Sequence, residues 1–221
     1  MKIRYRFRFS KLDRIRFIGH LDLMKLTQRC IKMAGVPIAY SSGFNPHQLL
    51  FFALPLSLGM GSVGEYMEME LAEELPAENI IEALNDKLPP GLEILKGRRM
   101  EQGEKSSASL VRGGLYKIKL PRAVELESAL ETLMGKQEIL AADTKKAGRT
   151  LDIRPHIFEL TYLNENEFTA MISSGSSGNL KPDLLLRALH EEMGMEYKSY
   201  DMSIMRLELL QKKEDEWITL D

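Results

Sequence analysis

The sequence KIRYRFRF (residues 2–9) alternates basic and apolar side chains without a break. A period of two is typical of a β-strand with one buried face, so we expect the aromatic rings in a core and Arg4, Arg6 and Arg8 on the opposite face. Working outward, the sequence predicts a helix over 20–34, strands over 36–40, 49–54 and 65–71, a helix over 77–88 and a strand over 92–96.

This order of strand, helix, one or more strands and a further strand, helix and strand is typical of a ferredoxin-like unit, the split βαβ arrangement. Residues 115–210 repeat the same order, beginning with the alternating stretch LYKIKL. We therefore expect an α+β protein made of two tandem ferredoxin-like units with antiparallel sheets. The expected boundaries are an N-terminal unit over 1–100, a polar linker over 101–113, a C-terminal unit over 114–212 and a tail over 213–221.

Composition excludes several classes of protein. With 221 residues, of which 44% are hydrophobic, the chain is long enough for one large or two small cores and too apolar to be disordered. No apolar run reaches the roughly 18–20 residues that cross a bilayer, and residues 1–9 lack the apolar core of a secretory signal. The single cysteine, Cys30, excludes an internal disulfide, a zinc finger and a self-contained iron–sulfur centre. We expect a cytoplasmic protein that is not embedded in a membrane.

Charge is nearly balanced overall, at −2, but it is unevenly placed. Residues 1–50 carry ten Lys and Arg and only two acids, whereas residues 51–100 carry four bases and nine acids. Because nucleic acids respond to a local basic patch rather than to the whole-chain charge, a basic first segment is compatible with RNA binding. The alternative is that this segment packs near acidic helices of the same protein.

Two motifs point to a known family. RFIGHLDL (residues 16–23) and YSSGFNPH (residues 40–47), the second continuing through ALPL (53–56) to GEY (64–66), together resemble the radical-SAM-linked protein family, a domain of unknown function. TKK (144–146), DIRP (152–155) and SGNLKP (177–182) support the resemblance. Members of this family occur beside radical S-adenosylmethionine proteins or fused to their C-terminus, so the resemblance implies such a protein as a partner.

Cysteine content separates this chain from that partner. A radical-SAM cluster is held by three cysteine thiolates, and this chain has only Cys30, which lies on the apolar face of the expected first helix. We therefore expect S-adenosylmethionine and the iron–sulfur cluster only in the partner, with no metal or cofactor in this chain. A thiol in that place is far more often part of a core than reactive, because burial raises its pKa.

The two motifs supply the candidate site residues. His20 and Asp22 lie at the start of the first helix, and His47 closes the motif loop formed by Gly43, Phe44, Asn45, Pro46 and His47. Two histidines and a carboxylate brought together would suit a metal site or general acid–base catalysis. The structural alternative is that His20 and Asp22 favour the helix N-terminus, while Asn45-Pro46 forms a turn.

Basic residues supply a candidate nucleic-acid surface. Arg4, Arg6 and Arg8 in line on an open sheet face would follow a phosphate backbone. The alternative is pairing across the sheet with Glu68 and Glu70. Stacking aromatics are missing from this face, since the rings of the strand point into the core. The remaining candidate nucleic-acid contacts are Arg16, Lys145, Lys146 and Arg154.

Arg154 has two possible roles, in a surface ion pair or in an anion-binding cluster. Asp152 and Arg154 lie on one side of an expected strand and would form a surface ion pair of little energetic value. Otherwise Arg154 joins Lys145 and Lys146 in an anion-binding cluster.

Two functions follow as hypotheses. The first is a non-catalytic accessory protein that binds RNA, including ribosome-related RNA, or presents a substrate to a radical-SAM enzyme. The second is a ferredoxin-like enzyme that processes or modifies RNA through His20, Asp22 and His47. The lack of cluster-binding cysteines favours the first.

Overall fold

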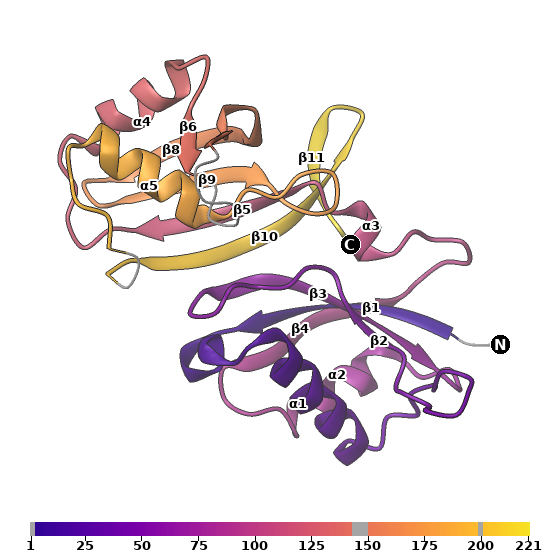
Figure 1. Ribbon diagram of the computed structural model, residues 1–221. Coiled ribbons are helices and arrows are strands. Elements are labelled where there is room, and N and C mark those ends of the chain that lie inside the picture. The colour runs from indigo at the N-terminus through magenta and orange to yellow at the C-terminus, as the bar shows by residue number, and fades with distance from the viewer. Residues whose placement is uncertain (1–2, 143–149, 199–200) are drawn as a thin grey trace. The chain divides into compact units, whose positions relative to one another are not determined.

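A computed structural model describes residues 3–142, 150–198 and 201–221 of the chain. The chain is a mixed α+β protein with antiparallel sheets and several helices (Figure 1). It divides into two compact units. The first unit comprises Met1–Val111 and Glu208–Asp221, and the second comprises Arg112–Leu207. No helix among the described residues is long and apolar enough to cross a membrane.

The first unit is built around its first strand. Its elements are β1 (Ile3–Lys11), η1 (Asp13–Phe17), α1 (His20–Met33), β2 (Leu50–Phe52), β3 (Gly61–Leu71), α2 (Ala77–Asn85), β4 (Leu92–Arg99) and α3 (Ser107–Leu110). Strand β1 lies between β4 and β3, β2 pairs with β3, and every pairing is antiparallel. Helices α1 and α2 cover one face of this sheet (Figure 1).

The alternation in β1 explains which face is covered. Tyr5, Phe7 and Phe9 are almost fully buried and pack with Met67 and Met69 of β3 in the core beneath the helices. Burying an aromatic side chain removes a large apolar area from water, which is the main force that docks the helices on this face. Cys30 is buried as well, and burial raises the pKa of its thiol.

The opposite sheet face of the first unit is also covered, in part by the C-terminal segment. Strand β10 (Ser203–Lys213) contributes its residues from Glu208 onward, and β11 (Glu216–Thr219) pairs with it. Leu220 is fully buried in a small apolar cluster with Tyr66 and Val111. Residues 213–221 therefore form a strand and a core contact where we expected a tail, and most of the expected linker 101–113 also belongs to this unit. Apolar side chains such as Val111 and Leu220 explain the difference, because their burial stabilises the folded first unit.

The second unit has the same order of strands. Its elements are β5 (Gly113–Lys119), α4 (Leu126–Gly135), β6 (Leu140–Ala142), β7 (Thr150–Asp152), η2 (Arg154–His156), β8 (Ile157–Asn164), β9 (Glu167–Ser173) and α5 (Pro182–Glu192). Its sheet has the order β10-β5-β9-β8, and the sheet of the first unit has the order β4-β1-β3-β2. In each sheet the fourth, first, third and second strands along the chain therefore lie side by side in that order, with β6 and β7 left out of the count. Strands β6 and β7 form a separate two-stranded pair. The core holds Tyr116 and Ile118 of β5 with Leu185 and Leu189 of α5.

Candidate functional site

The arginine row, defined as Arg4, Arg6 and Arg8, lies on the face of β1 that is turned away from α1 and α2. Register places Arg4 opposite Glu70, Arg6 opposite Glu68 and Arg8 opposite Tyr66 on β3. On the other side, Arg6 lies opposite Arg98 of β4. Side chains that are directly opposite on one sheet face are close enough to interact, so pairing of β1 with β3 places an acid beside Arg4 and beside Arg6.

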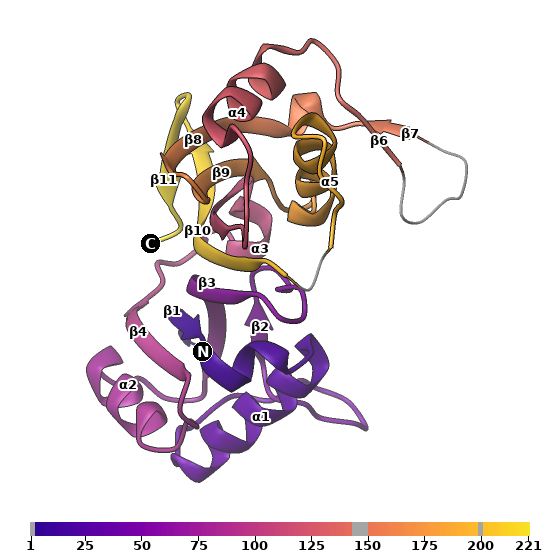
Figure 2. The ribbon, with the colours of Figure 1, turned by 90° about the vertical axis from the view of Figure 1, so that its left-hand side faces the viewer.

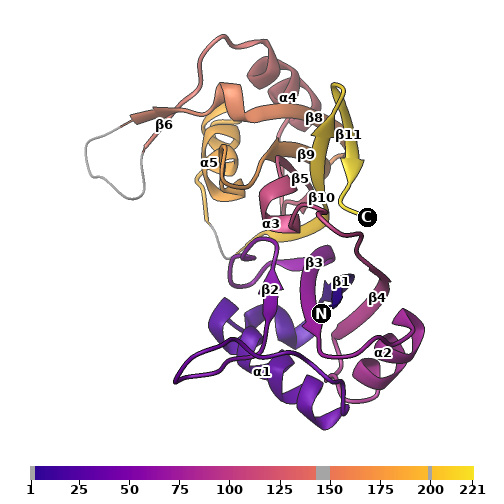
Figure 3. The ribbon, with the colours of Figure 1, turned by 90° about the vertical axis from the view of Figure 1, so that its right-hand side faces the viewer.

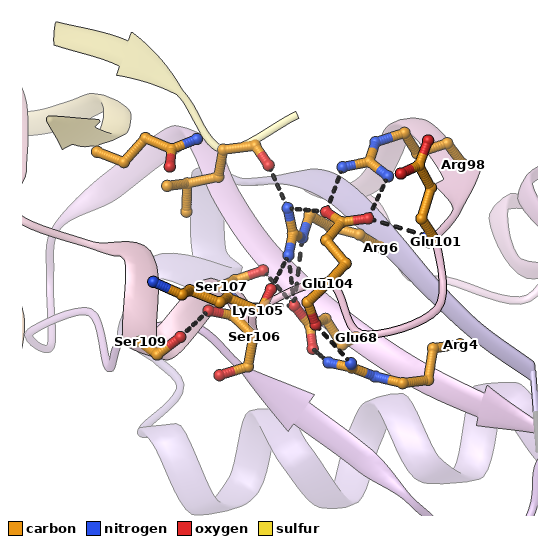
Figure 4. A network of polar contacts seen from close by, with 12 residues as sticks. Arg4, Arg6, Glu68, Arg98, Glu101, Glu104, Lys105, Ser106, Ser107 and Ser109 are labelled. Carbon is orange, nitrogen blue, oxygen red and sulfur yellow. Dashed lines mark hydrogen bonds and ion pairs between the residues drawn. The ribbon is translucent and has the colours of Figure 1, made fainter. Parts of the chain in front are cut away.

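Arg6 is the centre of a buried polar network (Figure 4). Only 2% of its surface is exposed. Its Nε and Nη2 donate to Oε1 of Glu68 at 3.2 and 3.1 Å, Nη2 also donates to the carbonyl of Lys105 at 2.7 Å, and Nη1 donates to the carbonyl of Leu220. A buried guanidinium is tolerated only when acceptors replace its water, and these carbonyls and carboxylates do so.

Glu68 joins the arginine row to the first residue of α3. Its Oε1 accepts hydrogen bonds from the backbone N–H and the hydroxyl of Ser107, both at 2.6 Å, and its Oε2 accepts one from Nη2 of Arg4 at 2.8 Å. Burial by itself would raise the pKa of the Glu68 carboxyl, but the hydrogen bonds from Ser107 and Arg4 and the charge of Arg6 lower it below its usual value. The carboxylate is therefore ionised at neutral pH.

Glu104 closes the other side of the network. Arg98 donates to both of its carboxylate oxygens, at 2.9 and 2.6 Å, and Arg6 lies 2.9 Å from Oε1. The hydrogen bonds from Arg98 are the main reason that the pKa of Glu104 falls to about 2. In Figure 4, Arg4 and Arg98 lie on opposite sides of the network, with Arg6 and Glu68 between them.

The expectation of an open arginine face needs correction at this point. Residues 104–107 and Leu220 cover Arg6, and Arg4 donates to the carbonyl of Glu104 at 2.9 Å. Arg8 forms an ion pair of 2.8 Å with Glu208, whose pKa is raised by burial. Three guanidinium groups side by side repel one another, so they fold stably with acids and carbonyls around them rather than in an unpaired row. A role of these arginines in RNA binding stays a prediction.

A cavity of about 380 Å³ lies beside this network within the first unit. We call it the Phe51 pocket, and its walls are Arg4, Phe51, Phe52, Ala53, Glu68, Glu70, Ser106, Ser107 and Ala108. Its volume is within the range of small-molecule sites, roughly 300–1,000 Å³. No local sequence pattern marks this pocket, because Phe51 and Ser106 meet there only through the pairing of β2 with β3 and the docking of α3.

The motif histidines lie in different surroundings. The ring of His20 packs edge-to-face on Phe52, with centroids 5.6 Å apart. Asp22 is exposed, and Nδ1 of His47 is 2.8 Å from the hydroxyl of Ser41. Among the residues that the structure describes, no group of three or more His, Cys, Asp and Glu side chains is placed to hold a metal ion. The structure thus gives His20, Asp22 and His47 no shared metal site, and catalysis by them stays a prediction.

The motif loop is held at its base and exposed at its tip. The hydroxyl of Ser41 accepts the backbone N–H of His47 at 3.1 Å, and the backbone N–H of Ser41 donates to the carbonyl of His47 at 2.9 Å. Phe44 at the tip is fully exposed. The loop projects beside α1 (Figures 2 and 3), to which Gln48 is joined by a 3.2 Å hydrogen bond from Nε2 to the carbonyl of Gln28.

The other predicted basic contacts are distributed differently. The Arg16 guanidinium lies over the ring of Phe17, 4.7 Å from its centroid. Arg154 donates to the carbonyls of Met134, Lys136 and Ile157, so its guanidinium links the end of α4 to the start of β8. The Asp152 carboxylate instead accepts the backbone N–H groups of Ile139 and Arg154. Lys145 and Lys146 lie outside the described residues.

A basic surface that the sequence analysis missed lies on α1. Lys25, Arg29 and Lys32, which we call the basic helix surface, are all exposed. Residues four and three apart lie on one face of a helix, so these three side chains share a stripe. Within the described part of the chain no acid pairs with them. The spacing of 25, 29 and 32 is the sequence signal for this surface, but the apolar residues of the same helix form the stronger periodic pattern.

Comparisons with known proteins add a family and one structural similarity. A family model described as "Uncharacterized protein conserved in bacteria (DUF2344)" matches residues 4–182. A search among curated proteins finds no match. Among solved structures, the chain is similar to one in the crystal structure of a Cbf5-Nop10-Gar1 complex, at 11% sequence identity and a TM-score of 0.44. The match covers 90% of this chain and 48% of that chain, so this chain spans about half the length of that protein.

Proposed function

We propose, from the premise that this chain belongs to the DUF2344 family of uncharacterized proteins conserved in bacteria, that it is a non-catalytic accessory protein that binds RNA and works with a radical-SAM enzyme. The observation that carries RNA binding is the basic helix surface on α1. Lys and Arg side chains that are exposed and unpaired release counterions from a phosphate backbone, which is the main source of nucleic-acid affinity.

Exposed aromatic side chains near α1 in the sequence favour single-stranded RNA as the ligand. Phe17 and Phe44 are exposed aromatic side chains that flank α1 in the sequence, with 59% and essentially all of their surface accessible. Base–aromatic stacking needs such rings, and it tolerates any sequence because every base has a π-face. The loop that carries Phe44 is held at its base by Ser41 and His47, so the ring is presented without a large loss of loop entropy.

The accessory role rests on two further arguments. The motifs of residues 16–23 and 40–47 resemble the radical-SAM-linked family, which implies a radical-SAM protein as the partner. His20 packs on Phe52 and His47 bonds to Ser41, so each motif histidine has a structural use. The shared strand order of the two units further supports the proposal that both are ferredoxin-like.

The test is RNA retention as a function of salt. The variant Lys25→Glu/Arg29→Glu/Lys32→Glu removes the basic helix surface and is expected to weaken retention of single-stranded RNA by at least tenfold. It should also lower the salt slope by about three, since each lost phosphate contact reduces that slope by about one.

The matched control is Lys105→Glu/Arg122→Glu/Lys181→Glu, which changes net charge equally at exposed positions elsewhere. Equal loss of RNA in both variants, or no loss in the first, contradicts RNA binding by α1. For the accessory role, the tagged full-length chain is expected to co-purify a radical-SAM enzyme from a bacterial extract, and repeated absence of one contradicts it.

A further inference from the structure

The Phe51 pocket combines an aromatic wall with charged hydrogen-bonding groups. Phe51, Phe52 and Ala108 form apolar walls, while Arg4, Glu68 and Ser106 supply polar atoms. A pocket of about 380 Å³ is large enough for a nucleobase with its ribose and too small for a stretch of polymer. The size and the lining together favour a single planar, polar ring system.

The register of the sheet places the aromatic wall next to the charges. Phe51 lies directly opposite Glu68, which lies directly opposite Arg6, so the three side chains share one sheet face. On β2, Leu50 is buried on the other face, whereas 49% of Phe51 is exposed. The sequence analysis found no stacking aromatic on the arginine face, and the edge strand supplies one.

The hydrogen-bonding capacity of the lining is specific. A guanidinium carries five N–H groups, and Arg4 uses Nη1 and Nη2 for the Glu104 carbonyl and for Oε2 of Glu68. An ionised carboxylate oxygen has two lone pairs, and among the described residues Oε2 of Glu68 accepts from Arg4 only. The lining therefore offers further N–H donors from Arg4 and a further acceptor position on Glu68.

Guanine is the base that matches this combination. Its N1–H donor suits the remaining acceptor position on Oε2 of Glu68, since Oε1 is already used by Arg6 and Ser107. Its neighbouring O6 and N7 acceptors suit two N–H donors of Arg4. Adenine carries an amino group where guanine has O6, and cytosine and uracil have no N7, so none of the three offers Arg4 the same pair of acceptors.

We infer that the Phe51 pocket binds a guanine base, stacked on Phe51 and hydrogen-bonded by Glu68 and Arg4. This inference rests on the proposed RNA function, since it names the base that an RNA strand would place in the pocket. The basic helix surface would hold the phosphates of the strand, and the Phe51 pocket would choose one base of it.

The test uses GMP, with AMP, CMP and UMP as competitors, on the full-length chain. NMR or calorimetric titration is expected to show at least tenfold tighter binding of GMP than of the other three nucleotides. Phe51→Ala should weaken GMP binding by about tenfold, the order expected for losing one base–aromatic stack. Phe51→Trp keeps an aromatic face and should retain binding, with quenching of the new tryptophan.

The matched control is Phe158→Ala, which removes a partly exposed ring from β8 of the second unit and should leave GMP binding unchanged. Absence of GMP binding, equal binding of the four nucleotides, or an unchanged affinity in Phe51→Ala overturns the inference. The charge-reversal variant of α1 distinguishes a failure of this inference from a failure of the proposed function. Selective GMP binding without RNA retention would defeat the proposed function alone, and RNA retention without GMP selectivity would defeat the pocket alone.

Discussion

Strands β1 and β5 open the two units with the same alternation of basic and apolar residues, yet their basic side chains end in different surroundings. On β1, Arg6 is 2% exposed and bonded to Glu68 and to two backbone carbonyls. On β5, Lys117 is half-buried and Lys119 is exposed, and they share one partner, Glu167, at 2.9 and 3.5 Å. An alternating pattern therefore decides which face a side chain occupies, and segments distant in the sequence decide whether that face stays in water.

The difference has an energetic consequence. An ion pair in water contributes little, because both charges are well solvated without each other and salt screens them. A buried pair gains little net stability either, but removing one partner leaves the other charge buried without compensation. Substitutions of matched acids in the two units should therefore have very different effects.

The largest expected effect comes from Glu68→Gln. This change removes the charge that compensates Arg6 and Arg4, and we expect the free energy of unfolding of the first unit to fall by about 3–5 kcal/mol. Trp217, the single tryptophan, lies in β11 of this unit, so its fluorescence during urea unfolding measures the effect. A loss below 1 kcal/mol would show that the network does not stabilise the fold.

An intermediate effect is expected from acid. The pKa of Glu104 is about 2 in the folded protein and 4.5 ordinarily, chiefly because of Arg98. A carboxyl whose pKa is lowered by folding stabilises the fold above its unfolded-state pKa, and this contribution is lost as the pH falls from 4.5 toward 2. We expect the stability of the first unit to decline across that window.

Glu104→Gln should flatten this decline, since the substituted side chain does not titrate. Urea unfolding of both proteins at several pH values between 2 and 7, followed by Trp217 fluorescence, gives the comparison. An unchanged pH profile in the variant would mean that other carboxylates cause the acid sensitivity.

The smallest effect is expected from Glu167→Gln. The side chain of Glu167 is partly buried, but those of Lys117 and Lys119 are 43% and 60% exposed, so both lysines remain hydrated when the carboxylate is neutralised. Circular dichroism of urea unfolding should show almost no change in stability. A destabilisation as large as that of Glu68→Gln would remove the contrast between the two strands.

Much of the fold followed from periodicity alone. The strand over 2–9, the helix beginning at His20 and the helix over 77–88 agree with β1, α1 and α2 within a few residues. These segments are predictable because each buries a face with its own period, so the local pattern and the tertiary contacts agree. The expected linker and tail differ from the structure. Their few apolar residues show no helical or strand periodicity, and they are buried only by packing against a sheet formed by other segments of the chain.

The candidate site followed from the sequence only in part. The placement of Arg4, Arg6 and Arg8 on one face was predicted, and so was the availability of Glu68 as their partner. Glu104, Ser107 and Leu220 were not, because the contacts of Arg6 with Glu104 and Leu220 join positions up to 214 residues apart. Such contacts depend on which segments meet in the fold, and no local spacing records them.

The sequence by itself determined the α+β class, the single buried thiol, the basic character of residues 1–50 and the face of each side chain on β1. Those properties depend on composition and on a period of two or 3.6 residues, which neighbouring residues set. Only the tertiary structure decided that the arginine row is enclosed, that the side chains of the basic helix surface are exposed and that Phe51 lies beside Arg4 and Glu68. These outcomes depend on strand register and on segments from both ends of the chain, because burial of a charge is settled by everything that packs around it.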